Sequence, residues 1–142
     1  MTDPKQKKGH HIALEDATKA NSDFRRVLYT GEQLQLVLMS LKPGEEIGLE
    51  THPENDQFFR FDAGNGKVII NSSEYSVTDG DSIIVPKGAE HNVINTAEEG
   101  GEDLKFYTIY APSHHKDGTV HATRAIAVDP ANEEDFDGTT TE

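Results

Sequence analysis

The chain has 142 residues, a formal net charge of −13 from 26 acidic side chains against 13 lysines and arginines, and no cysteine. This length predicts a single domain, and the negative charge argues against nucleic acids and anionic membrane surfaces as partners. Without cysteine, the chain forms no disulfides, thiolate metal sites or cysteine nucleophiles, so a bound metal would depend on histidine, carboxylate or amide ligands.

The N-terminal residues 1–25 are mostly polar, and we interpret them as an arm that precedes the domain, with at most a short helix in "LEDATKAN". The positive charges at the start of the arm are followed by no apolar run. A signal peptide or a membrane anchor would need such a run, so we expect neither and predict a cytoplasmic protein.

From Arg26 onward, short runs rich in apolar and β-branched residues alternate with turns rich in glycine, proline and asparagine. Nine runs are predicted to be strands: "RVLYT", "QLQLVLMSL", "EIGLETH", "QFFRFD", "KVIIN", "EYSVT", "DSIIVP", "HNVIN" and "LKFYTIYA". Their even spacing, without any long helical pattern, predicts an all-β sandwich or barrel rather than a parallel α/β fold.

The barrel domain is predicted to span residues 26–128, because residues 112–128 contain a histidine-rich loop, "PSHHKDGTVH", and a last edge strand, "ATRAIAV". Residues 129–142 are acidic and almost free of apolar side chains. This composition is typical of disorder, so we predict a flexible acidic tail. Deletion of residues 130–142 is then expected to leave the stability nearly unchanged.

A tight bend places a histidine at the start of a predicted strand in "GDSIIVPKGAEHNVIN", residues 80–95. Pro86 and Gly88 form the bend at the end of one strand. His91 begins the next strand and shares a face with Val93, because side chains two apart in a strand point the same way. The bend therefore aims the histidine in one direction.

The second segment with candidate ligands is "GEEIGLETHPENDQFFRFDAG", residues 44–64. Glu50 and His52 are two positions apart in a predicted strand and therefore share a face. The connection "PEND" reverses the chain, and Gln57 stands near the start of the returning strand. If both strands turn these faces to the interior of the barrel, the three side chains converge.

These two segments resemble the motifs of the cupin superfamily. The second motif of this family is matched at every position, by Gly80, Pro86, Gly88, His91 and Asn95. This match identifies the turn before His91 as the family's histidine-bearing turn.

Three positions of the first cupin motif are also matched, by Gly44, His52 and Gly64. Two ligand positions differ, because Glu50 replaces the usual first histidine and Gln57 replaces the usual glutamate. A spacing that is one residue shorter would select Asp56 in place of Gln57. The distance along the chain to Gly64 favours Gln57.

The resemblance covers about residues 26–112 and implies a double-stranded β-helix, the jelly-roll barrel of this family, with a metal site inside. The ligands would be Glu50, His52 and His91, with the amide of Gln57 as a weak fourth ligand. Two imidazoles and a carboxylate are the donor set of non-haem Fe(II) sites, and they also suit Mn, Ni or Zn. We therefore expect one divalent metal ion, Fe, Mn, Ni or Zn. The alternative is a metal-free cupin, in which hydrogen bonds alone satisfy these side chains.

The interior face is predicted to line an apolar pocket, with the candidate residues Met39, Phe59, Phe61, Val93 and Tyr107. Near the motifs only Lys42 and Arg60 could hold an anion. This balance favours an apolar or aromatic small molecule over a sugar phosphate as the ligand. The alternative is that most of these aromatic side chains only build the core.

The remaining histidines lie in the arm, at His10 and His11, and after the last core strand, at His114, His115 and His121. The loop histidines could form a lid over the barrel mouth and transfer a proton, with His115 as the lid candidate and Tyr110 beside it. Loops are normally exposed, so we favour a solvated loop. The arm histidines are expected to have no role.

The resemblance implies a small metal-dependent enzyme that acts on a small organic molecule, either as a dioxygenase or as an isomerase, cyclase or lyase. Glu50 would then serve both as a ligand and as a base. Two alternatives are a non-enzymatic module that binds a small metabolite or sugar, and a sealed structural barrel that serves in dimerisation. A homodimer is expected, because the exposed edges of a jelly roll pair readily.

Overall fold

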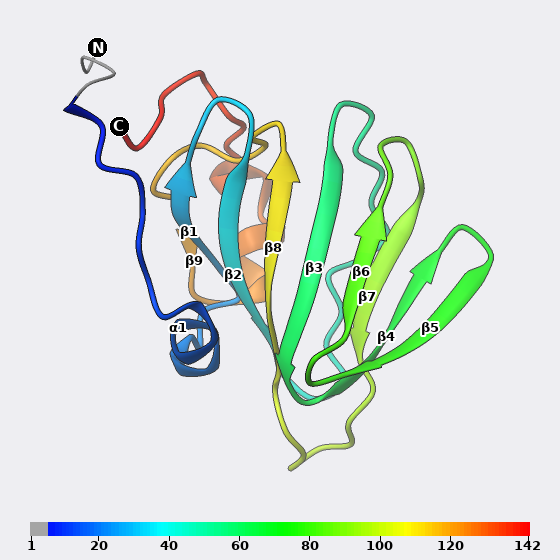
Figure 1. The fold of residues 1–142 in the computed structure, drawn as a ribbon. Coiled ribbons are helices and arrows are strands. Elements are labelled where there is room, and N and C mark those ends of the chain that lie inside the picture. Colours follow the sequence, from blue (N-terminus) through cyan, green and yellow to red (C-terminus); the bar gives the residue numbers. More distant parts are fainter. Residues whose placement is uncertain (1–5) are drawn as a thin grey trace.

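The computed structural model describes residues 6–142 and confirms the all-β class (Figure 1). The elements are α1 (Leu14–Ala20), β1 (Arg25–Thr30), β2 (Gln35–Leu41), β3 (Asp56–Ala63), β4 (Asn65–Ile70), β5 (Ser73–Thr78), β6 (Ser82–Val85), β7 (His91–Asn95), β8 (Leu104–Ala111), β9 (Val120–His121), α2 (Arg124–Val128) and the 3-10 helix η2 (Pro130–Asn132). The strands form a six-stranded sheet in the order β6-β3-β8-β2-β1-β9 and a three-stranded sheet in the order β5-β4-β7. Strands β1 to β8 correspond to eight of the nine predicted runs.

The hydrophobic core lies between the two sheets. Strand β8 runs between β2 and β3, and its side chains alternate between buried and less buried positions, as the period of two requires. Phe106 of β8 meets Phe59 and Phe61 of β3 at ring-centroid distances of 5.9 and 5.1 Å. The small sheet adds the fully buried Val93. This packed core fixes the position of the two sheets relative to each other.

Helix α1 forms where the arm meets the barrel, in agreement with the short helix expected there. It packs against β3 and β8, and the side chain of Thr18 is buried in the contact. In Figure 1 it lies outside the sheets, below β1 at the lower left of the view. None of the helices within residues 6–142 has both the length and the apolar character needed to cross a membrane.

The predicted strand over Ile47 to His52 is instead an extended segment with isolated bridges. The bridges occur at Glu46 and Glu50, both opposite β7. Between them, Gly48 has a φ of +109°, and its N–H donates to the side chain of Asn92 rather than to a strand backbone. This left-handed residue interrupts the ladder, yet the bridge at Glu50 keeps the candidate ligands beside β7.

The predicted edge strand "ATRAIAV" is a helix, α2, and the prediction was wrong at this point. Thr123 precedes the helix in an extended conformation, and its side chain accepts a hydrogen bond from the Ile126 N–H at 3.3 Å. This N-cap stabilises the helical turn. The strand that follows β8 is β9, which pairs with β1 just before the cap.

The acidic C-terminal segment lies along the barrel, in contrast to the disorder expected for it. Asp135 forms a β-bridge with His115. Further along, the Thr141 N–H donates to the Thr30 carbonyl at 2.8 Å, and the Thr30 N–H donates to the Thr141 hydroxyl at 2.8 Å. These contacts are hydrogen bonds rather than apolar burial, so composition alone indicated no docking.

Deletion of residues 130–142 tests whether this segment is docked on the barrel, as in the structure, or disordered, as its composition predicts. Because the deletion removes the hydrogen bonds to the barrel, we expect a net loss of about 1 to 2 kcal/mol, or roughly 3 to 8 °C in melting temperature for a domain of this size. Circular dichroism melts of the full and truncated chains measure this difference. An unchanged melting temperature would support a disordered tail.

Candidate metal centre

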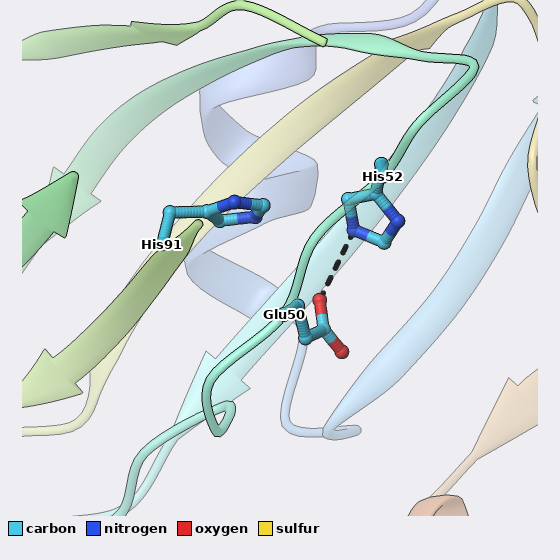
Figure 2. A group of neighbouring side chains, drawn as sticks. All are labelled: Glu50, His52 and His91. Atoms are coloured by element: carbon cyan, nitrogen blue, oxygen red, sulfur yellow. Dashed lines mark hydrogen bonds and ion pairs between the residues drawn. The ribbon is translucent and has the colours of Figure 1, made fainter. Parts of the chain in front are cut away.

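Glu50, His52 and His91 bring their ligand atoms together inside the barrel. One ligand atom from each lies within 4.8 Å of the other two, and Figure 2 shows the three side chains converging. His91 is the first residue of β7, and the backbones of His91 and Glu50 exchange two hydrogen bonds of 2.9 Å. These bonds fix the two chain segments relative to each other, so the predicted convergence of the three ligands is present.

The bend at Pro86 and Gly88 aims His91 into the site. The Gly88 N–H donates to the His52 carbonyl at 2.9 Å, so the bend is tied to the other ligand segment. The Nδ1 of His91 lies 3.0 Å from the Ala89 carbonyl, which can only accept, so Nδ1 carries the proton. This tautomer leaves Nε2 of His91 free as a metal ligand.

A hydrogen bond joins the other two ligands. The Nε2 of His52 lies 3.2 Å from Oε2 of Glu50, so a proton occupies the space between two ligand atoms (Figure 2). Metal binding at such a pair displaces this proton. The pair therefore has the donor atoms of a candidate metal site.

Burial and neighbouring charges set the protonation states of the ligands. Burial raises the pKa of Glu50, but the hydrogen bond and charge of His52, together with Arg25 and His91, outweigh it and hold the pKa below its ordinary value. Burial lowers the pKa of His91. The carboxylate is thus ionised and this imidazole neutral near pH 7, which are the forms that bind metals.

Gln57 lies on the interior face of β3. It is buried, and its Nε2 donates to the Thr108 hydroxyl at 3.0 Å. Its Oε1 is also buried and has no hydrogen-bond partner among residues 6–142. Asp56, selected by the alternative spacing, is exposed and accepts a hydrogen bond from the Lys87 N–H at 2.9 Å. The structure therefore turns Gln57, and not Asp56, to the interior.

The donor set fits a divalent metal ion. Two imidazoles and one carboxylate converge, and Gln57, the predicted fourth ligand, has its amide oxygen buried without a partner among residues 6–142. Unpaired buried acceptors are uncommon in folded proteins, and a ligand is one explanation for them. The set suits Fe, Mn, Ni or Zn without selecting among them.

The histidine-rich loop packs over the site instead of lying in solvent. The ring of His114 is 4.5 Å from the ring of His52 and stacks on Tyr110 at 5.1 Å. The Nε2 of His115 lies 3.3 Å from the Tyr110 hydroxyl. From the sequence we favoured a solvated loop, with a lid of the loop histidines as the alternative, and named His115 rather than His114 as the lid candidate. The cluster of histidines just after the last core strand was the sequence feature that could have indicated this position of the loop.

A cavity of about 250 Å³ reaches Glu50 from the barrel mouth. Its walls include His114 and His115 of the loop, Arg25 and His121 of the paired strands β1 and β9, and residues from α2 to Asp135. Burial, with the charge of His52, lowers the pKa of His114 to about 4. Burial and the charge of Arg25 hold the pKa of His115 well below its ordinary value. Both imidazoles are therefore neutral near pH 7.

The predicted apolar pocket differs from this cavity. Met39, Phe59, Phe61 and Val93 are packed in the core with at most 1% of their surface exposed, and none of them lines the cavity. Tyr107 lies on the other face of β8, where its ring meets Phe58 at 6.4 Å. The alternation along β8 that turns Phe106 inward turns Tyr107 outward. The cavity is consequently built from side chains at the barrel mouth.

The family model described as "Cupin domain" matches residues 37–110, which include the three candidate ligands. The uncharacterized protein YrkC of Bacillus subtilis is 48% identical over 82% of this chain, which spans 64% of the length of that relative. The uncharacterized protein L612 of Acanthamoeba polyphaga mimivirus is 37% identical over 80% of this chain and 71% of its own length.

Solved structures agree with the fold. The crystal structure of BH2720 from Bacillus halodurans superposes with a TM-score of 0.81 at 44% identity, over 89% of this chain and 98% of the other. An RmlC-like cupin from Shewanella frigidimarina, 20% identical, gives a TM-score of 0.56 over 63% of this chain and 75% of its own. The chain therefore belongs to the cupin family, has its jelly-roll barrel and carries a candidate metal-binding triad.

Proposed function

We propose that this cupin is a metal-dependent enzyme that acts on a small organic molecule, as a dioxygenase or as an isomerase, cyclase or lyase. The supporting observation is the convergence of Glu50, His52 and His91, of which Glu50 also lines a cavity of about 250 Å³. A purely structural barrel has no need of three ionisable side chains that face one point, because their removal from water has a cost that their hydrogen bonds only offset.

The residues of the site would have two roles, to bind the ion and to act on the substrate. His52, His91, Glu50 and Gln57 would hold the ion, which supplies Lewis acidity and a fixed point for orienting the substrate. One carboxylate oxygen of Glu50 suffices as a ligand, so the other can accept a substrate proton. The ring of His114 packs against His52 and keeps bulk water from that side of the site.

Two other functions follow from the same fold. A binding module that recognises a small metabolite or sugar would use the same cavity without turnover. A sealed structural barrel fits less well, because the cavity opens beside Glu50. The fold hosts enzymes and binding proteins alike, so the choice depends on the chemistry of the site.

Elemental analysis of protein purified without a chelator or a His-tag tests the metal site. We expect near-stoichiometric Fe, Mn, Ni or Zn in the wild type and loss of this metal in the triple variant Glu50→Ala, His52→Ala, His91→Ala. The double variant His10→Ala, His11→Ala, which changes two exposed histidines of the arm, should keep the metal. The metal found then selects oxidation assays or isomerase and lyase assays. A wild type without metal after incubation with Fe(II), Mn(II), Ni(II) and Zn(II) would contradict the proposal.

A further inference from the structure

Arg25 places a positive charge in the wall of the cavity. It begins β1 opposite Met39 of β2, which belongs to the core, so its side chain is on the interior side of the sheet. Only 7% of its surface is exposed, and it lines the same cavity as Glu50. Its neighbour Arg26 points outward and pairs with Asp23 at the surface.

The guanidinium of Arg25 has few partners. Its Nη1 donates to Nδ1 of His121 at 3.2 Å, and the group lies 5.3 Å from the centre of the Phe24 ring. Its Nε is buried without a partner, and none of the carboxylates within residues 6–142 comes within ion-pair distance of it. Most of its five donors are therefore unused.

The unused donors of Arg25 point to an anionic partner next to this side chain, although the cavity as a whole carries more acidic than basic side chains. Buried charges in proteins are normally paired, because an unpaired one loses its hydration without compensation. Glu50 belongs to the same cavity, but an ion held by Glu50 would take up its negative charge. The planar fork of an arginine matches the two oxygens of a carboxylate. Building on the proposed function, we propose that the cavity binds a small carboxylate, whose anionic group is held by Arg25.

The rest of the cavity narrows the class of carboxylate. Its volume, about 250 Å³, admits a small molecule, and Phe24, Ile47 and Val128 offer an apolar surface. The outer wall carries the exposed acidic side chains Asp129, Glu133, Glu134 and Asp135. These repel ligands with several negative charges, such as phosphate esters and dicarboxylates. The substrate class is therefore a monocarboxylate with a compact apolar body.

Arg25 takes the place of Arg60 and Lys42, the two residues expected from the sequence to hold an anion. Arg60 lies 3.5 Å from Asp62, which neutralises its charge. Lys42 is exposed, and neither residue lines the cavity. The sequence-based expectation of an apolar ligand rested on other residues, which do not line the cavity, and it included no carboxylate.

Pairs of acids and their amides test the proposal in the wild-type protein. We expect isovalerate and benzoate to bind at least about tenfold more tightly than isovaleramide and benzamide, because only the acids pair with the guanidinium. Ligand-observed NMR measures these weak affinities. Succinate should bind more weakly than either monocarboxylate. Equal binding of acids and amides, or no binding of either acid, would overturn the proposal.

Variants of Arg25 test whether this side chain causes the preference for acids over amides. Arg25→Gln should abolish the preference for acids, and Arg25→Lys should keep part of it, because lysine retains the charge but not the fork. Arg26→Gln, on the outer face of the same strand, is the matched control and should bind acids like the wild type. If both Arg25 variants fail to fold, the comparison of acids with amides in the wild type still decides. Folded Arg25→Gln protein that keeps the preference would refute the role of Arg25.

The same titrations separate this inference from the proposed function. They are made on metal-free protein and on protein loaded with Zn(II), with the zinc content measured in each sample. An Arg25-dependent preference for acids in a protein that takes up no metal would support the anion site and contradict the metal-dependent enzyme. Zinc binding at the triad without any preference for acids would overturn the anion site alone.

Discussion

The free energy of unfolding of the metal-free protein is expected to fall by several kcal/mol as the pH is lowered from 6.5, the ordinary pKa of histidine, to 4. The cause is a group of histidines around the barrel mouth whose pKa values are lowered by burial above all: His91, His114, His115 and His121. In the folded protein each of these imidazoles takes up its proton at a lower pH than in the unfolded chain.

The free energy of unfolding falls with falling pH because the unfolded chain takes up more protons than the folded protein. A histidine whose folded pKa is lowered contributes stability that is complete above its unfolded pKa and is lost as the pH falls toward the folded pKa. Each such histidine contributes a slope of about 1.4 kcal/mol per pH unit while only the unfolded chain binds the proton. The carboxylate of Glu50 adds a further loss only below about pH 4.5, its ordinary pKa, because its folded pKa is also lowered.

Urea unfolding at a series of pH values, in the presence of a chelator, measures the profile. In His114→Asn the slope should decrease by up to about 1.4 kcal/mol per pH unit, because one titrating group is removed. The variant His11→Asn, which changes an exposed histidine of the arm, should follow the wild type. A wild-type stability that is constant from pH 6.5 to pH 4 would contradict the neutral, buried state of these histidines.

Substitution of Gly64 by alanine is expected to destabilise the barrel by about 2 to 5 kcal/mol. Gly64 lies between β3 and β4 with a φ of +86°, and a Cβ built there would lie 2.5 Å from the carbonyl oxygen of Asp103. The backbone cannot move apart without disturbing β8, which begins at the next residue, Leu104. This glycine of the first motif therefore serves the packing of the sheets rather than the chemistry of the site.

Gly88 is the matched control for the steric part of this effect. Its φ of +84° is nearly the same, but a Cβ built there would meet nothing within 4 Å. The variant Gly88→Ala should lose only about 1 to 2 kcal/mol, the cost of the left-handed conformation. Chemical denaturation of both variants gives the comparison. Equal losses in the two would show that conformational strain, and not the contact with Asp103, governs Gly64.

The strand pattern and the candidate ligands were predictable because they depend on short stretches of sequence. Period-two alternation marks β8 and the inward face of β3 with Phe59. The Pro86 and Gly88 bend aims His91 through hydrogen bonds within a few residues and to the facing ligand segment. The spacing of two between Glu50 and His52 places both on one side even though their segment is not a regular strand.

The surroundings of the ligands were decided by contacts between distant parts of the chain. His114 stacks on Tyr110 and reaches His52 only because the loop after β8 folds back over the barrel mouth. Arg25 faces the cavity because β1 is held between β2 and β9. Neither contact leaves a local pattern, since it depends on strand order and on the path of the loop.

Local geometry and residue spacing control the barrel class, the motif turn and the convergence of the three candidate ligands, and these features could therefore be predicted from the sequence. The folded structure was needed to show which side chains line the cavity, that Tyr107 points outward and that the acidic segment beyond α2 lies along the barrel. These features arise from long-range packing and from hydrogen bonds between backbone groups, which composition and periodicity do not encode.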